Sequence, residues 1–186
     1  MPNAYSAFDP YEDRTARDIR NRLSTAFIRA IETGDVRRLE SDASVICPPD
    51  SERAFCSFAD EQLDRYRRAI EMIRAERITD PLHRAVLLWN AGLFFEVHEI
   101  LETVWNDAQR WRKEALRGLI QAAGVYVHWQ RGAGQAAEKL AARAAAHLST
   151  HREDLPELAN IEALLEALTD PERPAPALEF IARRVE

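Results

Sequence analysis

The sequence holds few of the residues that cross-link a chain or interrupt its helices. Only 2 of its 186 residues are cysteine and only 6 are glycine. Cys47 and Cys56 lack the C-x-x-C spacing of redox and zinc sites, and no second cysteine pair completes a metal site. We therefore expect two free thiols, as in a protein of a reducing compartment.

Long apolar runs and excess positive charge are also lacking. No uncharged run approaches the length of a membrane span, and the N-terminus, MPNAYSAFDPYEDR, is polar and acidic where a signal peptide is basic and then apolar. Lys and Arg number 25 against 31 Asp and Glu, which gives a net charge of -6. This balance argues against nucleic acid and anionic membrane surfaces as partners. We expect a cytoplasmic protein.

The sequence is rich in hydrophobic residues that recur at the spacing of a helix. They make up 46% of the chain, enough for a packed core. Their spacing of three and four residues predicts helices over residues 15–33, 58–78, 81–92, 93–106, 108–131, 133–149, 158–168 and 177–185. The predicted fold is therefore all-α: a compact bundle of antiparallel helix pairs with an extra N-terminal helical element and no sheet.

Breaks in this spacing suggest three regions. Residues 1–57 are expected to form an N-terminal helix and a proline-containing connector. Residues 58–150 would form the core helical domain, and residues 151–186 would add C-terminal helices that pack on it. Within the core domain, Asp80-Pro81 is a helix start and Gly92 fits a left-handed helix end.

The segment FFEVHEILETVW carries the most informative pattern. On a helical wheel with about 100° per residue, one arc about 120° wide holds mainly large apolar residues together with a histidine and a carboxylate. This arc consists of Phe94, Phe95, His98, Leu101, Glu102 and Trp105. Glu96 and Glu99 fall on the opposite side, which we expect to be wet. We therefore predict that His98 and Glu102 are largely removed from water.

Two interpretations of this H-E-x-x-E pattern are open. The functional one is a metal or acid/base site, and the structural one is a buried hydrogen bond between His98 and Glu102. The pattern lacks the second imidazole of the H-E-x-x-H zinc motif, and no Glu is followed three residues later by His, as di-iron helices require. No metal and no cofactor is therefore predicted, although His128 or His147 could complete a mixed site.

The next helix presents a polar stripe that includes Arg117, Gln121 and His128. The plain interpretation is a solvent-facing surface. The alternative is that these three side chains point toward Glu102 across a helix pair. Gly118 and Gly124 in the same helix reduce its stability relative to alanine and suggest that another helix approaches closely.

These residues carry a resemblance to a known family. The run LLWNAGLFFEVHEILETVW, followed by RGLIQAAGVYVHWQRG and AAEKLAARAAAHL, resembles the domain-of-unknown-function 309 family, whose hallmark is similar to W-x-x-G-x-[FY]-[FY]-E-x-H-E-x-L-E-x-x-W. The resemblance spans residues 82–148 and implies a compact all-α fold. It also implies a cluster built on His98, Glu99, Glu102 and Trp105, without any particular activity. One departure is Arg117, where the family tends to have Gln.

Two classes of function remain from the sequence. The first is a non-catalytic binding or self-assembly module, which includes a homo-oligomer, because the chain has helical hairpins and no complete catalytic signature. The second is a metal-assisted or acid/base hydrolase centred on His98, Glu99 and Glu102. The sequence leaves open whether the protein is an enzyme and what its partner is. The arginines between Arg65 and Arg77 alternate with acids and predict a solvated helix face rather than a nucleic-acid site.

Overall fold

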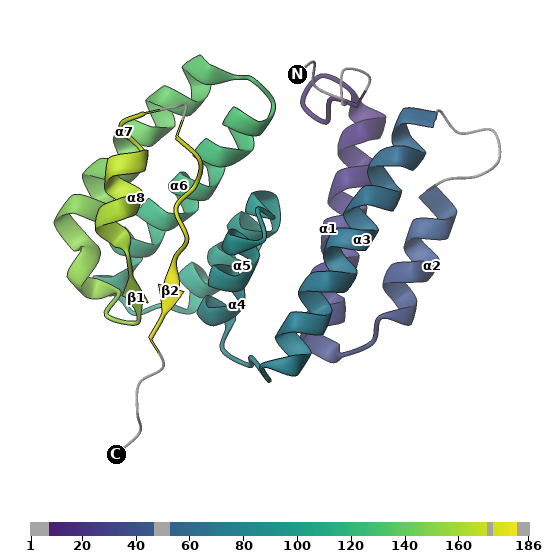
Figure 1. Cartoon of the computed structure of the whole chain (residues 1–186), viewed down its shortest axis with the longest axis horizontal. Coiled ribbons are helices and arrows are strands. Elements are labelled where there is room, and N and C mark those ends of the chain that lie inside the picture. The colour runs from purple at the N-terminus through teal and green to yellow at the C-terminus, as the bar shows by residue number, and fades with distance from the viewer. Residues whose placement is uncertain (1–7, 47–52, 171–172, 182–186) are drawn as a thin grey trace. The chain divides into compact units, whose positions relative to one another are not determined.

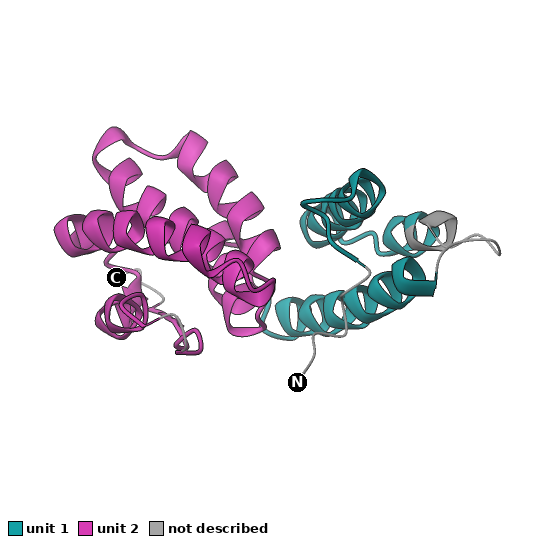
Figure 2. Cartoon of the chain, turned by 90° about the horizontal axis from the view of Figure 1, so that it is seen from above, with its two compact units in different colours: residues 1–77 teal, residues 78–186 magenta. Residues whose placement is uncertain are grey.

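Helices dominate the described part of the chain. A computed structural model describes residues 8–46, 53–170 and 173–181 (Figure 1). The chain divides into two units, Met1–Arg77 and Ile78–Glu186 (Figure 2). The all-α prediction is confirmed.

In the described residues of the first unit, three helices all contact one another: α1 (Arg14–Thr33), α2 (Arg37–Ile46) and α3 (Arg53–Ala75). Its core holds large side chains from α1 and α3. Phe27 and Tyr66 are fully buried and stack with their ring centroids 4.2 Å apart. The unit therefore has a core of its own.

The boundary between the units differs from the one expected at residues 57 and 58. It lies at Arg77 and Ile78, because α3 packs on α1 and α2 and so belongs to the first unit. Cys56, on α3, is a free thiol, and Cys47 lies outside the described residues.

Five α-helices, each in contact with the next, lie in the part of the second unit that the structure describes. They are α4 (Pro81–Asn90), α5 (Phe94–Asp107), α6 (Lys113–Gln130), α7 (Gly134–His151) and α8 (Ile161–Ala167). Two short 3-10 turns, η1 (Arg110–Arg112) and η2 (Arg152–Asp154), precede α6 and follow α7. In the described part of the chain no helix combines the length and apolar character needed to cross a membrane.

Local signals set the limits of α4 as predicted. The Asp80 carboxylate accepts a hydrogen bond of 2.8 Å from the backbone N–H of His83, and Pro81 occupies the first helical position. After the helix, Gly92 has φ +70°, a left-handed conformation that costs glycine little. The chain then turns back at once into α5.

The predicted close approach of a helix to Gly118 and Gly124 is confirmed, and the helix is α7. A Cβ atom on Gly118 would lie 2.8 Å from Cγ of Leu148, and one on Gly124 would lie 2.8 Å from Cδ2 of Leu140. These distances are shorter than van der Waals contact. The two glycines therefore let α6 and α7 pack closely.

Near its C-terminus the chain is extended rather than helical. Strands β1 (Leu158–Ala159) and β2 (Glu179–Phe180) form a two-stranded antiparallel sheet. The expectation of no sheet was therefore wrong, and so was the predicted helix over the described residues 177–181. Residues 182–185 of that predicted helix lie outside the described residues.

Side chains of α4 hold this extended segment in place. The indole N–H of Trp89 donates to the carbonyl of Pro176 at 2.8 Å. The amide of Asn90 donates to the carbonyl of Leu178 at 2.8 Å and accepts from the N–H of Leu178 at 2.9 Å. These bonds satisfy backbone groups that a helix would otherwise pair internally.

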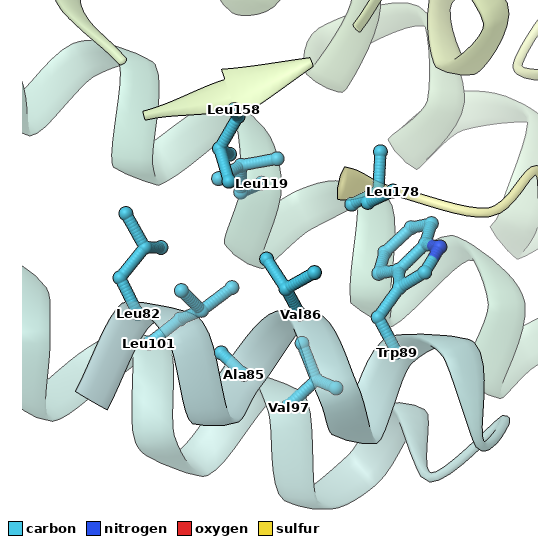
Figure 3. Close-up of a pocket in the computed structure, with 9 residues that line it drawn as sticks. All are labelled: Leu82, Ala85, Val86, Trp89, Val97, Leu101, Leu119, Leu158 and Leu178. Carbon is cyan, nitrogen blue, oxygen red and sulfur yellow. The ribbon is translucent and has the colours of Figure 1, made fainter. Parts of the chain in front are cut away.

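A small apolar cavity lies within the second unit. Figure 3 shows the residues that line this cavity. Its volume is about 10 Å³. A cavity of this volume holds about one water molecule. The lining side chains are Leu82, Ala85, Val86, Trp89, Val97, Leu101, Leu119, Leu158 and Leu178. This cavity is therefore too small for an organic ligand.

Candidate functional site

The rotation of α5 about its own axis decides which residues of FFEVHEILETVW are accessible. Its buried residues are Phe94, Glu96, Val97, Ile100 and Leu101. They span an arc centred between Val97 and Ile100, about a third of a turn from the predicted arc centred on His98. Glu96, expected to be wet, is 1% exposed. The core therefore encloses a different carboxylate from the one predicted.

The same rotation makes the predicted polar cluster accessible. The side chains of His98, Glu99 and Glu102 are 33%, 41% and 56% exposed. The prediction that His98 and Glu102 are largely removed from water was therefore wrong. The helical wheel identified one apolar arc, but the arc that packs against the core is the neighbouring one, through Val97 and Ile100.

These three side chains lie close together without hydrogen bonds between them. Nδ1 of His98 is 3.6 Å from Oε1 of Glu99, and Nε2 of His98 is 3.8 Å from Oε1 of Glu102. Both distances exceed those of a good hydrogen bond. Nδ1 of His98 is buried and has no hydrogen-bond partner among the described residues. A structural hydrogen bond between His98 and Glu102 therefore does not explain the pair.

Trp105 links α5 to the start of α6. Its indole N–H donates to the carbonyl of Lys113 at 3.1 Å. The Lys113 ammonium lies 4.4 Å from the centre of the ring, and the Arg117 guanidinium lies 5.7 Å from it. Both are cation–π distances, so the ring of Trp105 helps to place these two cations.

A carboxylate and an imidazole hold Arg117 from its other side. Nη1 of Arg117 donates to both carboxylate oxygens of Glu114, at 2.8 and 2.9 Å. Oε2 of Glu114 is in turn 3.2 Å from Nδ1 of His147 on α7. His147 is thus engaged with Glu114 rather than with the cluster on α5.

A surface pocket is lined by residues of both α5 and α6. It has a volume of about 400 Å³ and is lined by Glu102, Trp105, Asn106, Arg117 and Ile120. Arg117 and Glu102 therefore line the same space.

Gln121 and His128, the other members of the predicted α6 stripe, do not line this pocket. Both are half-buried on α6. The Gln121 carbonyl oxygen is buried without a hydrogen-bond partner among the described residues. Burial, and then the charge of Arg131, lowers the pKa of His128 below its ordinary value. Neither side chain is placed to act with Glu102.

His98, Glu99 and Glu102 have the chemistry of a divalent metal site. One ligand atom from each lies within 4.8 Å of the others, the one such group of metal-ligating side chains in the described residues. Ligands about 2.1 Å from a tetrahedral ion lie about 3.4 Å apart. Modest rotation of the exposed carboxylates would reach that spacing. Imidazole with carboxylate ligands suits zinc and the neighbouring transition metals.

Comparison with known proteins agrees with the motif-based resemblance. Residues 82–140 match the family described as "Domain of unknown function (DUF309)". No curated protein and no solved structure matches the chain. The match covers about a third of the chain, from the second residue of α4 through the whole of α5 and α6 into the first turns of α7. The segment that carries His98, Glu99, Glu102, Trp105 and Arg117 is therefore similar to the domain of unknown function 309 family.

Proposed function

We propose that this protein is a binding domain whose α5 helix takes a divalent transition-metal ion through His98, Glu99 and Glu102. The observation that carries the proposal is the convergence of one imidazole and two carboxylates within 4.8 Å on an accessible helix face. An isolated acidic surface would lack the imidazole, which favours zinc, cobalt and nickel over magnesium and calcium.

The unsatisfied state of the three side chains supports this function. They approach one another at 3.6 and 3.8 Å without hydrogen bonding, and two adjacent carboxylates repel each other in the absence of a cation. Their exposure leaves them free to rotate around an ion. A merely structural pair would be expected to form a short hydrogen bond instead.

Calorimetric titration of the metal-freed protein with Zn²⁺ tests the proposal. We expect one equivalent to bind to the wild-type protein, and His98→Ala and Glu102→Gln each to weaken binding at least tenfold. His151→Ala is the matched control, since His151 is a similarly exposed histidine 3.3 Å from a carboxylate, that of Asp154, outside the cluster. Binding of equal strength in all four proteins, or no binding at all, would refute the proposal.

Metal-assisted hydrolysis is a second candidate, favoured by the pocket that adjoins Glu102. His98, Glu99 and Glu102 would hold the ion, which would supply Lewis acidity when bound. In this reaction Arg117 would bind and orient an anionic substrate, and Trp105 would shield one wall of the pocket from water. Metal-dependent hydrolysis of a chromogenic phosphate ester that Glu102→Gln abolishes would support it. Metal binding without hydrolysis of the ester would contradict the hydrolase and leave only the metal-binding function.

A further inference from the structure

We infer that the pocket between α5 and α6 receives an oxyanion group, such as a phosphate or a carboxylate, bound between Arg117 and the metal ion. This inference rests on the proposed metal site. Three observations support it: the Nε and Nη2 edge of the Arg117 guanidinium, the charges around the pocket, and the residues that line the pocket.

Arg117 presents its bidentate edge without a partner. Both oxygens of Glu114 contact the same nitrogen, Nη1. Nε and Nη2 have no hydrogen bond or ion pair with any described residue. This pair of N–H groups matches two oxygens of a phosphate or a carboxylate, the geometry for which arginine is used in recognition. Glu114 thus fixes the guanidinium and leaves that edge for a ligand.

The charges around the pocket make anion binding depend on the metal. Glu102 and Arg117 line the pocket itself. Two further carboxylates lie next to residues of the site, Glu99 at His98 and Glu114 at Arg117, against one further cation, Lys113 at Trp105. Without a metal the excess of negative charge repels an anion. A divalent ion reverses the sign, so the anion and the metal should each strengthen the binding of the other by the same factor.

The lining of the pocket fits a small ligand with an apolar part. Trp105 and Ile120 form apolar walls beside Arg117, and a volume of about 400 Å³ accommodates a small organic molecule. The inferred ligand is therefore a small phosphorylated or carboxylated compound rather than a long polyanion, whose many charges the overall acidity of the chain would repel.

Titration of the protein with methylphosphonate, with and without Co²⁺, tests this inference, and acetate serves as the carboxylate arm. We expect at least tenfold tighter binding of one of the two anions when Co²⁺ is bound. Arg117→Gln should weaken anion binding about tenfold or more without weakening Co²⁺ binding or changing the far-ultraviolet circular dichroism. Arg143→Gln, at an exposed arginine on α7, is the matched control.

The outcomes separate the two proposals. If Co²⁺ does not bind, the proposed function fails, and this inference fails with it. If Co²⁺ binds and neither anion binds, or if Arg117→Gln leaves anion affinity unchanged, only the inference is overturned. Anion binding that is equal with and without Co²⁺ also overturns it, because the charge argument requires the two ligands to be coupled.

Discussion

Replacing Tyr126 by Phe should stabilise the protein, because it removes a buried hydroxyl group that has no hydrogen-bond partner among the described residues. Tyr126 is 4% exposed, and its ring packs against Trp89, Phe94 and Trp129 at centroid distances of 5.2, 5.0 and 4.9 Å. Phenylalanine keeps these ring contacts. A buried polar group without a partner costs about 1–3 kcal/mol. We expect the variant to gain about 1 kcal/mol or more in unfolding free energy at pH 7.

The gain should grow at alkaline pH. Burial raises the pKa of Tyr126 to about 12, whereas a tyrosine in the unfolded chain has a pKa of about 10. Between these values the unfolded chain loses the phenolic proton and the folded protein keeps it, so the wild-type protein loses stability as the pH rises. At pH 10.5 this difference adds about 0.8 kcal/mol to the advantage of the variant.

Urea unfolding of the wild-type protein and of Tyr126→Phe at pH 7 and pH 10.5 measures both effects. Tyr11→Phe, at a less buried tyrosine in the first unit, controls for the loss of a phenol in general. A loss of 1 kcal/mol or more in Tyr126→Phe at pH 7 would refute the reasoning. It would mean that the hydroxyl has a partner, such as an enclosed water molecule, and that burial alone does not describe its environment.

Three further substitutions test other parts of the second unit. Glu102→Ala should cost less than about 1 kcal/mol in a urea melt, because its side chain is 56% exposed; a cost above 2 kcal/mol would show that it is structurally engaged. Gly118→Ala should cost about 1–3 kcal/mol, since the new methyl group would lie 2.8 Å from Leu148, while Gly134→Ala, with nothing within 4 Å, should be near neutral. The lowered pKa of His128 means that the unfolded chain takes up a proton first as the pH falls below about 6.5, so stability should fall there. His128→Gln should reduce that loss between pH 7.5 and pH 5.5, and an unchanged slope would contradict the assignment.

Helix ends could be predicted from the sequence because their chemistry is local. Asp80 bonds to a backbone N–H three residues away, and Gly92 adopts φ +70° within a single turn. The two glycines that face α7 were also informative, because a helix-destabilising residue in a helix needs a packing reason. Such signals require no knowledge of which distant elements meet.

The extended segment at residues 176–180 could not be predicted in the same way. Its apolar residues have helical spacing, but Trp89 and Asn90, on α4, supply the hydrogen bonds that hold it extended. These partners lie 87 and 88 residues away in the chain. Tertiary hydrogen bonds thus override a local pattern, and no window of neighbouring residues contains that information.

The rotation of α5 was the error that mattered for function. Two overlapping arcs of its wheel are apolar, one through Phe95 and His98 and one through Val97 and Ile100, and periodicity alone does not rank them. The arc with β-branched side chains faces the core, and the arc with His98 and Glu102 stays half-exposed. The wheel therefore identified the cluster but assigned it to the wrong environment.

This environment allows binding and folding to be tested separately. His98 and Glu102 are half-exposed and make no hydrogen bond with each other, so their replacement should remove few stabilising contacts. A loss of metal affinity in these variants would then report on ligation rather than on unfolding. If Glu102 were buried, as the sequence predicted, its replacement would leave a buried partner without a hydrogen bond and destabilise the fold. A loss of metal binding could then not be distinguished from a loss of structure. The accessible position thus makes substitution of Glu102 a clean measure of what the carboxylate binds.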